Sequence, residues 1–93
     1  MDVKEAVRLA KQYVIELFAE ETITNVGLEE VKFDEATNTW SVTIGFSRPW
    51  DQPQSPIAAI AGHMLYPKRS YKVILISDDN AKVISVKNHE VES

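Results

Sequence analysis

Residues 40–47 read WSVTIGFS, a stretch in which large apolar residues alternate with small or polar ones. The large residues are Trp40, Val42, Ile44 and Phe46, and those between them are Ser41, Thr43, Gly45 and Ser47. Successive side chains of a strand point to opposite faces of a sheet, so this alternation is typical of a strand with one buried face. The stretch therefore predicts a half-buried strand over 40–47, whose large residues require a cover.

The cover is expected from the N-terminal part of the chain, where residues 3–20 have the pattern of an amphipathic helix. Apolar residues recur there at spacings of three and four, which gathers them on one side of a helix. They are Val3, Ala6, Val7, Ala10, Tyr13, Val14, Leu17 and Phe18. Asp2 and Glu5 suggest an N-cap with an acidic residue in the first turn. We expect a helix from about 3 to 20 that packs on the large residues of 40–47.

Another strand is expected over residues 26–33. Leu28 and Val31 are both apolar but differ in parity, and a β-bulge near Glu29 and Glu30 would bring them to the same face. The polar residues that follow have the length and composition of a hairpin turn. The bulge also decides whether the two adjacent carboxylates converge, since neighbouring strand residues otherwise point to opposite faces.

Two more strands, 70–77 and 82–87, are expected to form a hairpin around a tight turn at 78–81. Residues 71–76 are apolar at almost every position, so this strand requires a cover on both faces. The helix can cover only one of them. Two sets are then left for the other face, namely Ile74 and Ile76, or Tyr71, Val73 and Leu75. The residues expected to contact a second chain are Tyr71, Val73, Ile74 and Ile76.

These elements predict one α+β domain over residues 1–93, in which an N-terminal helix packs on a four-stranded antiparallel meander. The length of the chain also fits a single domain. A long connection, 48–69, joins the second and third strands and contains all four prolines. It is expected to be structured, with a short helix beginning at Ser55 and Pro56. The polar tail, 88–93, is expected to fray.

Basic residues flank the long connection, and aromatic residues lie within it. Pairing of the second and third strands would gather four of them, Arg48, Lys68, Arg69 and Lys72, at one end of the sheet. With neighbouring aromatic rings they would form a mouth for an anion, an acidic peptide or a base. The alternative is a set of solvated charges at the strand ends. The candidate binding residues are Arg48, Trp50, His63, Tyr66, Lys68 and Arg69.

The composition argues against several classes of function. The chain has no cysteine, so it can form neither a disulfide nor a thiolate site. His63 and His89 lack the companions of a metal site, and no catalytic motif is present, so we expect neither an enzyme nor a metal or cofactor. A net charge of −4 argues against nucleic acid and anionic membranes as partners. The lack of cysteine and of a signal peptide favours the cytoplasm.

Two stretches resemble small PepSY-type domains of cystatin-like architecture, namely EAVRLAK at residues 5–11 and YKVILISDDNAKVISV at residues 71–86. The resemblance implies a helix on a curved antiparallel meander, and a domain that binds or restrains a partner protein without catalysis. The sequence departs from the pattern where Asn80 and Ala81 replace the usual glycine of the last turn, and where 48–69 is added. The Gln-x-Val-x-Gly hairpin tip of cystatin inhibitors is absent, so protease inhibition is not implied.

From these observations we expect a non-catalytic, bacterial-type binding or interaction domain, homodimeric through the uncovered face of its sheet. One alternative is a pocket for a small ligand or anion under the 48–69 segment, with weak enzymatic use. Another is an immunity or inhibitor protein for a single partner. The sequence alone does not decide between these three hypotheses.

Overall fold

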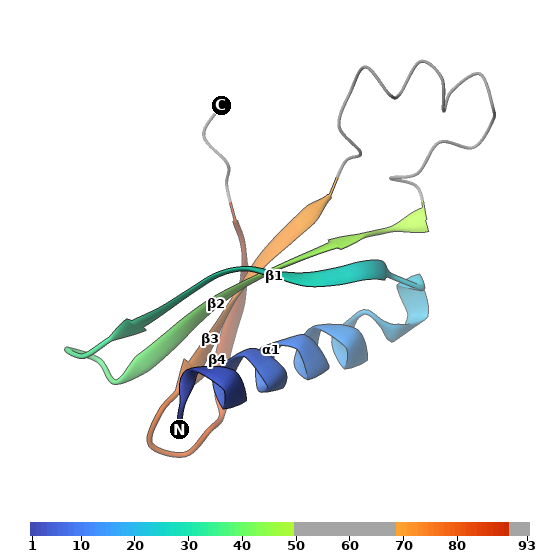
Figure 1. Cartoon of the computed structure of the whole chain (residues 1–93). Helices are drawn as coiled ribbons and strands as arrows, with labels where there is room; N and C mark the ends of the chain where they lie inside the picture. The colour runs from blue at the N-terminus through green and yellow to red at the C-terminus, as the bar shows by residue number, and fades with distance from the viewer. Residues whose placement is uncertain (50–68, 90–93) are drawn as a thin grey trace.

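The computed structural model describes residues 1–49 and 69–89, and within them a helix lies beneath a twisted four-stranded sheet (Figure 1). The elements are α1 (Val3–Leu17), the 3₁₀ turn η1 (Ala19–Glu21), β1 (Thr24–Asp34), β2 (Thr39–Ser47), β3 (Ser70–Ser77) and β4 (Val83–Asn88). The sheet has the order β1-β2-β3-β4, and neighbouring strands are antiparallel. The predicted α+β arrangement of a helix on a meander is confirmed. The expected structure of 50–68 lies outside the described residues, as does the end of the tail.

Helix α1 begins where it is predicted, because Asp2 caps it. The Glu5 backbone N–H donates a hydrogen bond of 2.8 Å to the Asp2 Oδ1, which satisfies one of the free donors at the start of the helix. The helix ends at Leu17, earlier than the predicted end near 20. The chain there tightens into η1, a common way for the last turn of a helix to finish.

Strand β1 contains the predicted bulge. Leu28 and Glu30 lie opposite consecutive residues of β2, so Glu29 is an extra residue in β1. The bulge restores a common parity, and Val31 packs against the core on the α1 side of the sheet. Leu28 and Val31 therefore share one face, as the sequence predicts.

The core lies between α1 and the central strands β2 and β3. Its completely buried side chains are Ala6, Ala10 and Val14 from α1, Val42, Ile44 and Phe46 from β2, and Ile74 and Ile76 from β3. Small residues on the helix allow it to approach the sheet closely, and large residues on the strands fill the remaining space. The large residues of β2 are thus covered by α1, as the sequence predicts.

The burial of individual side chains also decides which β3 residues face away from α1, a question that the sequence leaves open. Ile74 and Ile76 lie opposite Val42 and Trp40 of β2 and are 0% exposed. Their expected role as contacts for a second chain is therefore wrong, because neither side chain reaches the surface. Tyr71, Val73 and Leu75 alternate with them and so face away from α1.

The turn between β3 and β4 holds Ala81 in the left-handed region, at φ 57°. The Ala81 N–H donates to the Ser77 carbonyl at 2.9 Å, which fixes this conformation. A left-handed backbone costs an alanine about 1 kcal/mol and costs a glycine little. We expect Ala81→Gly to raise the free energy of unfolding by about 0.5–1 kcal/mol, measured by urea denaturation.

Ala36→Gly is the matched control, because Ala36 lies in the β1–β2 turn and is not among the left-handed residues. That substitution relieves no strain and adds freedom to the unfolded chain, so it should lower the stability slightly. Equal losses of stability in both variants would show that Ala81 is not strained.

Candidate functional site

The candidate site is the face of the sheet that points away from α1, which we call the open face. Within residues 1–49 and 69–89, no helix or strand covers it (Figure 1). A row of large β3 residues runs beside a row of small β2 residues at its centre. The register pairs are Tyr71 with Gly45, Val73 with Thr43, and Leu75 with Ser41. The three β3 residues are half-buried, so the centre of the open face is largely apolar surface that stays partly in contact with water.

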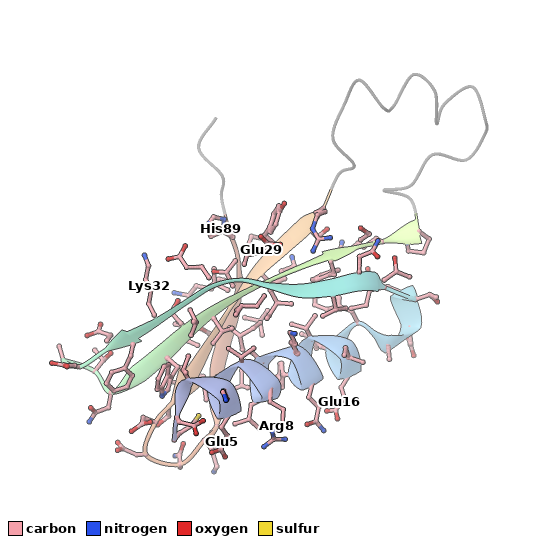
Figure 2. All side chains as sticks on the ribbon, in the orientation of Figure 1. Glu5, Arg8, Glu16, Glu29, Lys32 and His89 are labelled. Carbon is pink, nitrogen blue, oxygen red and sulfur yellow. The ribbon has the colours of Figure 1, made fainter. Side chains whose placement is uncertain are left out.

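The bulge in β1 brings two adjacent carboxylates to the open face. Glu30 lies opposite Thr43 and shares its side of the sheet. A Cβ added at Gly45 would lie 2.8 Å from the Glu29 Oε1, so the Glu29 side chain extends over the same side. Figure 2 shows Glu29, Lys32 and His89 together on the side away from α1. Glu29 and Glu30 therefore lie on the same face because of the bulge, but each pairs with a different cation, Arg69 or Lys32.

Arg69 crosses the open face from the start of β3 towards β1. Its Nη2 donates to the Asn25 carbonyl at 3.0 Å and lies 3.4 Å from the Glu29 Oε1. Below it are Gly27 and Gly45, whose added Cβ atoms would lie 3.9 and 2.9 Å from the same nitrogen. The absence of a side chain at Gly45 therefore makes room for this ion pair above the sheet.

The two margins of the open face carry charged residues. On β1, Lys32 pairs with Glu30 at 2.8 Å. This hydrogen bond lowers the pKa of Glu30 and raises the pKa of Lys32, but both groups are exposed, so the pair contributes little to stability. On β4, Lys87 lies opposite Val73. Just after β4, the His89 ring meets the Tyr71 ring edge-on, with 6.4 Å between the ring centroids.

Arg48 lies on the other side of the sheet, at the end where α1 finishes. Its guanidinium carbon is 5.2 Å from the centroid of Phe18 and 5.6 Å from that of Phe46. The two rings themselves pack at 5.1 Å. The Arg48 Nε is 3.5 Å from the Glu21 Oε1. Arg48 is therefore held between aromatic rings and a carboxylate of η1.

Lys72 approaches the same aromatic residue from β3. Its Nζ is 5.8 Å from the Phe18 centroid and donates a hydrogen bond to the Asn88 side-chain oxygen. Burial lowers the pKa of Lys72, the nearby charge of Arg48 lowers it further, and Glu21 offsets part of the effect. Lys72 and Arg48 thus form a second charged group, separated from the open face by the sheet.

The expected convergence of Arg48 and Arg69 in one mouth is wrong. Both lie at the same end of the sheet, but Arg48 has the parity of Phe46 and faces α1, whereas Arg69 has the parity of Tyr71 and faces away. The remaining candidate binding residues, Trp50, His63, Tyr66 and Lys68, lie outside the described part of the chain. Sequence reasoning missed the charged margins of the open face, and the bulge was the one signal that could have located the β1 margin.

At the opposite end of the sheet, a polar contact closes the core. The Trp40 Nε1–H donates to the Asp78 Oδ1 at 2.9 Å, and the N-terminal amine lies 3.5 Å from the same oxygen. The hydrogen bond from Trp40 is the main reason why the pKa of Asp78 is lowered, and the N-terminal charge adds to the effect. Phe33 packs on Trp40 at 4.8 Å between centroids. This contact has a structural role, because it ties the start of α1 to the β3–β4 turn.

Two shallow grooves flank α1, because one helix about 10 Å wide cannot cover four strands. The groove towards β4 has a volume of about 420 Å³ and the groove towards β1 about 340 Å³. Within residues 1–49 and 69–89, no group of three acidic or histidine side chains is placed to hold a metal ion. In the same ranges, no helix is long and apolar enough to cross a bilayer.

The described residues thus offer two candidate binding surfaces, namely the open face and the two cations, Arg48 and Lys72, beside Phe18. Comparisons of the chain with protein-family models, with curated proteins and with solved structures found no match. The resemblance to PepSY-type domains therefore stays a prediction.

Proposed function

We propose that this domain is a non-catalytic interaction module that forms a homodimer, with two copies packed sheet to sheet through their open faces. The observation that carries the proposal is the half-buried row of Tyr71, Val73 and Leu75 at the centre of a face that no described element covers. An apolar centre between charged margins is the usual anatomy of a protein interface. The PepSY-like resemblance agrees with a binding role, because such domains are thought to act on partner proteins without catalysis.

A second copy fits the open face because the face is complementary to itself. A two-fold axis that runs between β2 and β3, parallel to the strands, places β2 of one copy on β3 of the other. Residues paired in register lie at the same level along the strands. Thr43 would then face the partner's Val73, and Ser41 would face the partner's Leu75, whereas the Arg69–Glu29 ion pair already lies above Gly45. Large residues meet smaller ones at these two levels, which lets two sheets approach to about 10 Å.

The same axis also brings opposite charges together at the margins. It places β1 of one copy on β4 of the other. Glu30, Thr43, Val73 and Lys87 lie at one level across the sheet, so Glu30 would face the partner's Lys87. An axis perpendicular to the strands at the level of Glu30 would instead place β1 on β1 and set the two Glu30 carboxylates against each other, which is unfavourable. Charge complementarity therefore supports a second copy of the chain as the partner, and it supports the orientation in which β1 faces β4.

Sedimentation velocity over a range of protein concentrations tests the proposal. We expect a reversible monomer–dimer equilibrium. Lys87→Glu should weaken it by about tenfold, because Glu30 and the new glutamate repel each other across the margin. The double variant with Glu30→Lys exchanges the two charges and should recover much of the loss.

A protein that sediments as a monomer at high micromolar concentration would refute the homodimer. Failure of the exchanged pair to recover any affinity would refute the orientation in which β1 faces β4. A monomeric chain that binds a single different protein through this face would instead favour an inhibitor or immunity role.

A further inference from the structure

The groove between α1 and β1 is an apolar surface that is open to water. It is lined by three apolar residues, Val3, Val7 and Leu28, and by Lys4, and its volume is about 340 Å³. Val3 is 45% exposed and Leu28 is 42% exposed. We call it the β1 groove. It lies on the side of the sheet that carries α1, so it is separate from the open face.

A stripe of cations runs along α1 from the β1 groove. Arg8 and Lys11 follow Lys4 at spacings of four and then three residues, which makes the three side chains neighbours on the surface of the helix. Figure 2 shows Arg8 projecting from α1 away from the sheet. None of the three forms an ion pair or a side-chain hydrogen bond with a residue in 1–49 or 69–89. We call Lys4, Arg8 and Lys11 the basic stripe.

The basic stripe is unfavourable for the helix that carries it. Lys4 lies in the first turn of α1, where the helix dipole favours acidic residues over cations. Arg8 has a like charge four residues before it and another three residues after it, and such pairs destabilise a helix. Glu5 in the first turn offsets part of this cost, but the repulsion between the cations remains. A local rule broken in this way is expected at a functional site.

We propose that the β1 groove binds a short acidic segment of a partner protein, which places an apolar side chain against Val7 and Leu28 and its carboxylates against the basic stripe. Charge complementarity identifies this occupant, because three cations gather beside an apolar surface in a chain whose net charge is −4. The groove towards β4 lacks this character, since it is lined by both Glu16 and Lys82. The proposed dimer uses the opposite side of the sheet, so either proposal can fail without the other.

The test is a selection of short random peptides displayed on phage, with the full chain as the bait. We expect the selected peptides to carry aspartate or glutamate on both sides of a large apolar residue, and to bind less tightly as the salt concentration rises. In an NMR titration with a selected peptide, the largest amide shifts should fall at Val3–Val7 and Leu28. Selection of no peptide or of basic peptides would overturn the inference. Shifts of the same amides when the chain alone is concentrated would also overturn it, because the occupant would then be a second copy.

Two variants separate binding at the β1 groove from a general effect of charge. Lys4→Glu should weaken binding of the selected peptide by at least about tenfold, because repulsion replaces attraction beside the groove. The same substitution suits the helix dipole and removes a like charge near Arg8, so it should raise the midpoint of urea denaturation. Lys82→Glu is the matched control, since it makes the same change of charge at the groove towards β4 and should leave the affinity unchanged. Equal weakening by both variants, or wild-type affinity in Lys4→Glu, would contradict the proposed site.

Discussion

Replacing Val73 with glutamate is expected to abolish self-association, raising the dissociation constant of the dimer by about 100-fold or more. Val73 lies at the centre of the open face, opposite Thr43. In the isolated chain it is half-buried, so a glutamate there can still turn its carboxylate to water. In the proposed dimer the position would be covered by the partner's sheet. Lys87 lies opposite this position in the same chain, but in the proposed dimer it faces the partner's Glu30. Burial of the added carboxylate would therefore still cost several kcal/mol, and about 2.7 kcal/mol corresponds to about 100-fold in affinity.

Ile15→Glu provides the matched control for this prediction. Ile15 is 50% exposed on α1, which packs on the opposite side of the sheet. The substitution adds the same charge in place of an exposed β-branched residue, and it should leave the dimer intact. Sedimentation velocity gives the dissociation constants, and urea denaturation verifies that each monomer folds. Undiminished association of Val73→Glu, or equal weakening by both variants, would contradict the proposed interface.

The general architecture could be predicted because two segments carry unambiguous periodicity. Strict alternation in residues 40–47 fixes which side of β2 is buried. The 3.6-residue pattern of α1 supplies the apolar stripe that covers it. Even the bulge in β1 could be predicted, since Leu28 and Val31 could share one face only if an extra residue lay between them. In each case the pattern alone shows which side chains are buried, even when the pairing of the strands is unknown.

The faces of β3 could not be predicted because its sequence is apolar on both sides. Only the register, in which Ile74 lies opposite Val42, decides which set is buried. Because the register between β2 and β3 could not be predicted, Arg48 and Arg69 were expected to lie in one binding mouth. Each residue follows the parity of its own strand, and the relative parity of two strands depends on their pairing. The charged margins of the open face were missed for this reason too, since Lys87 reaches that face only through its register with Val73.

Arg48 and the core meet at Phe46, and Phe46→Ala is expected to have the largest effect on stability. The side chain is 0% exposed and packs on Phe18 at 5.1 Å, with Arg48 above it. Removing a buried phenylalanine ring costs about 3–5 kcal/mol, because the apolar contact is lost and a cavity remains. A domain of this size is stabilised by about 5–10 kcal/mol in total. We expect the midpoint of thermal unfolding to fall by about 15 °C or more.

Phe33→Ala is the control that separates this effect from the loss of any aromatic pair. Phe33 also packs on a ring, that of Trp40 at 4.8 Å, but it is 39% exposed at the far end of the sheet. Its removal leaves no enclosed cavity and should cost about 1 kcal/mol. If Phe46→Ala cost no more than Phe33→Ala, the packing of α1 on β2 would not be the main source of stability. The contact between Phe18 and Phe46 at 5.1 Å would then contribute little to holding the end of α1 on the sheet.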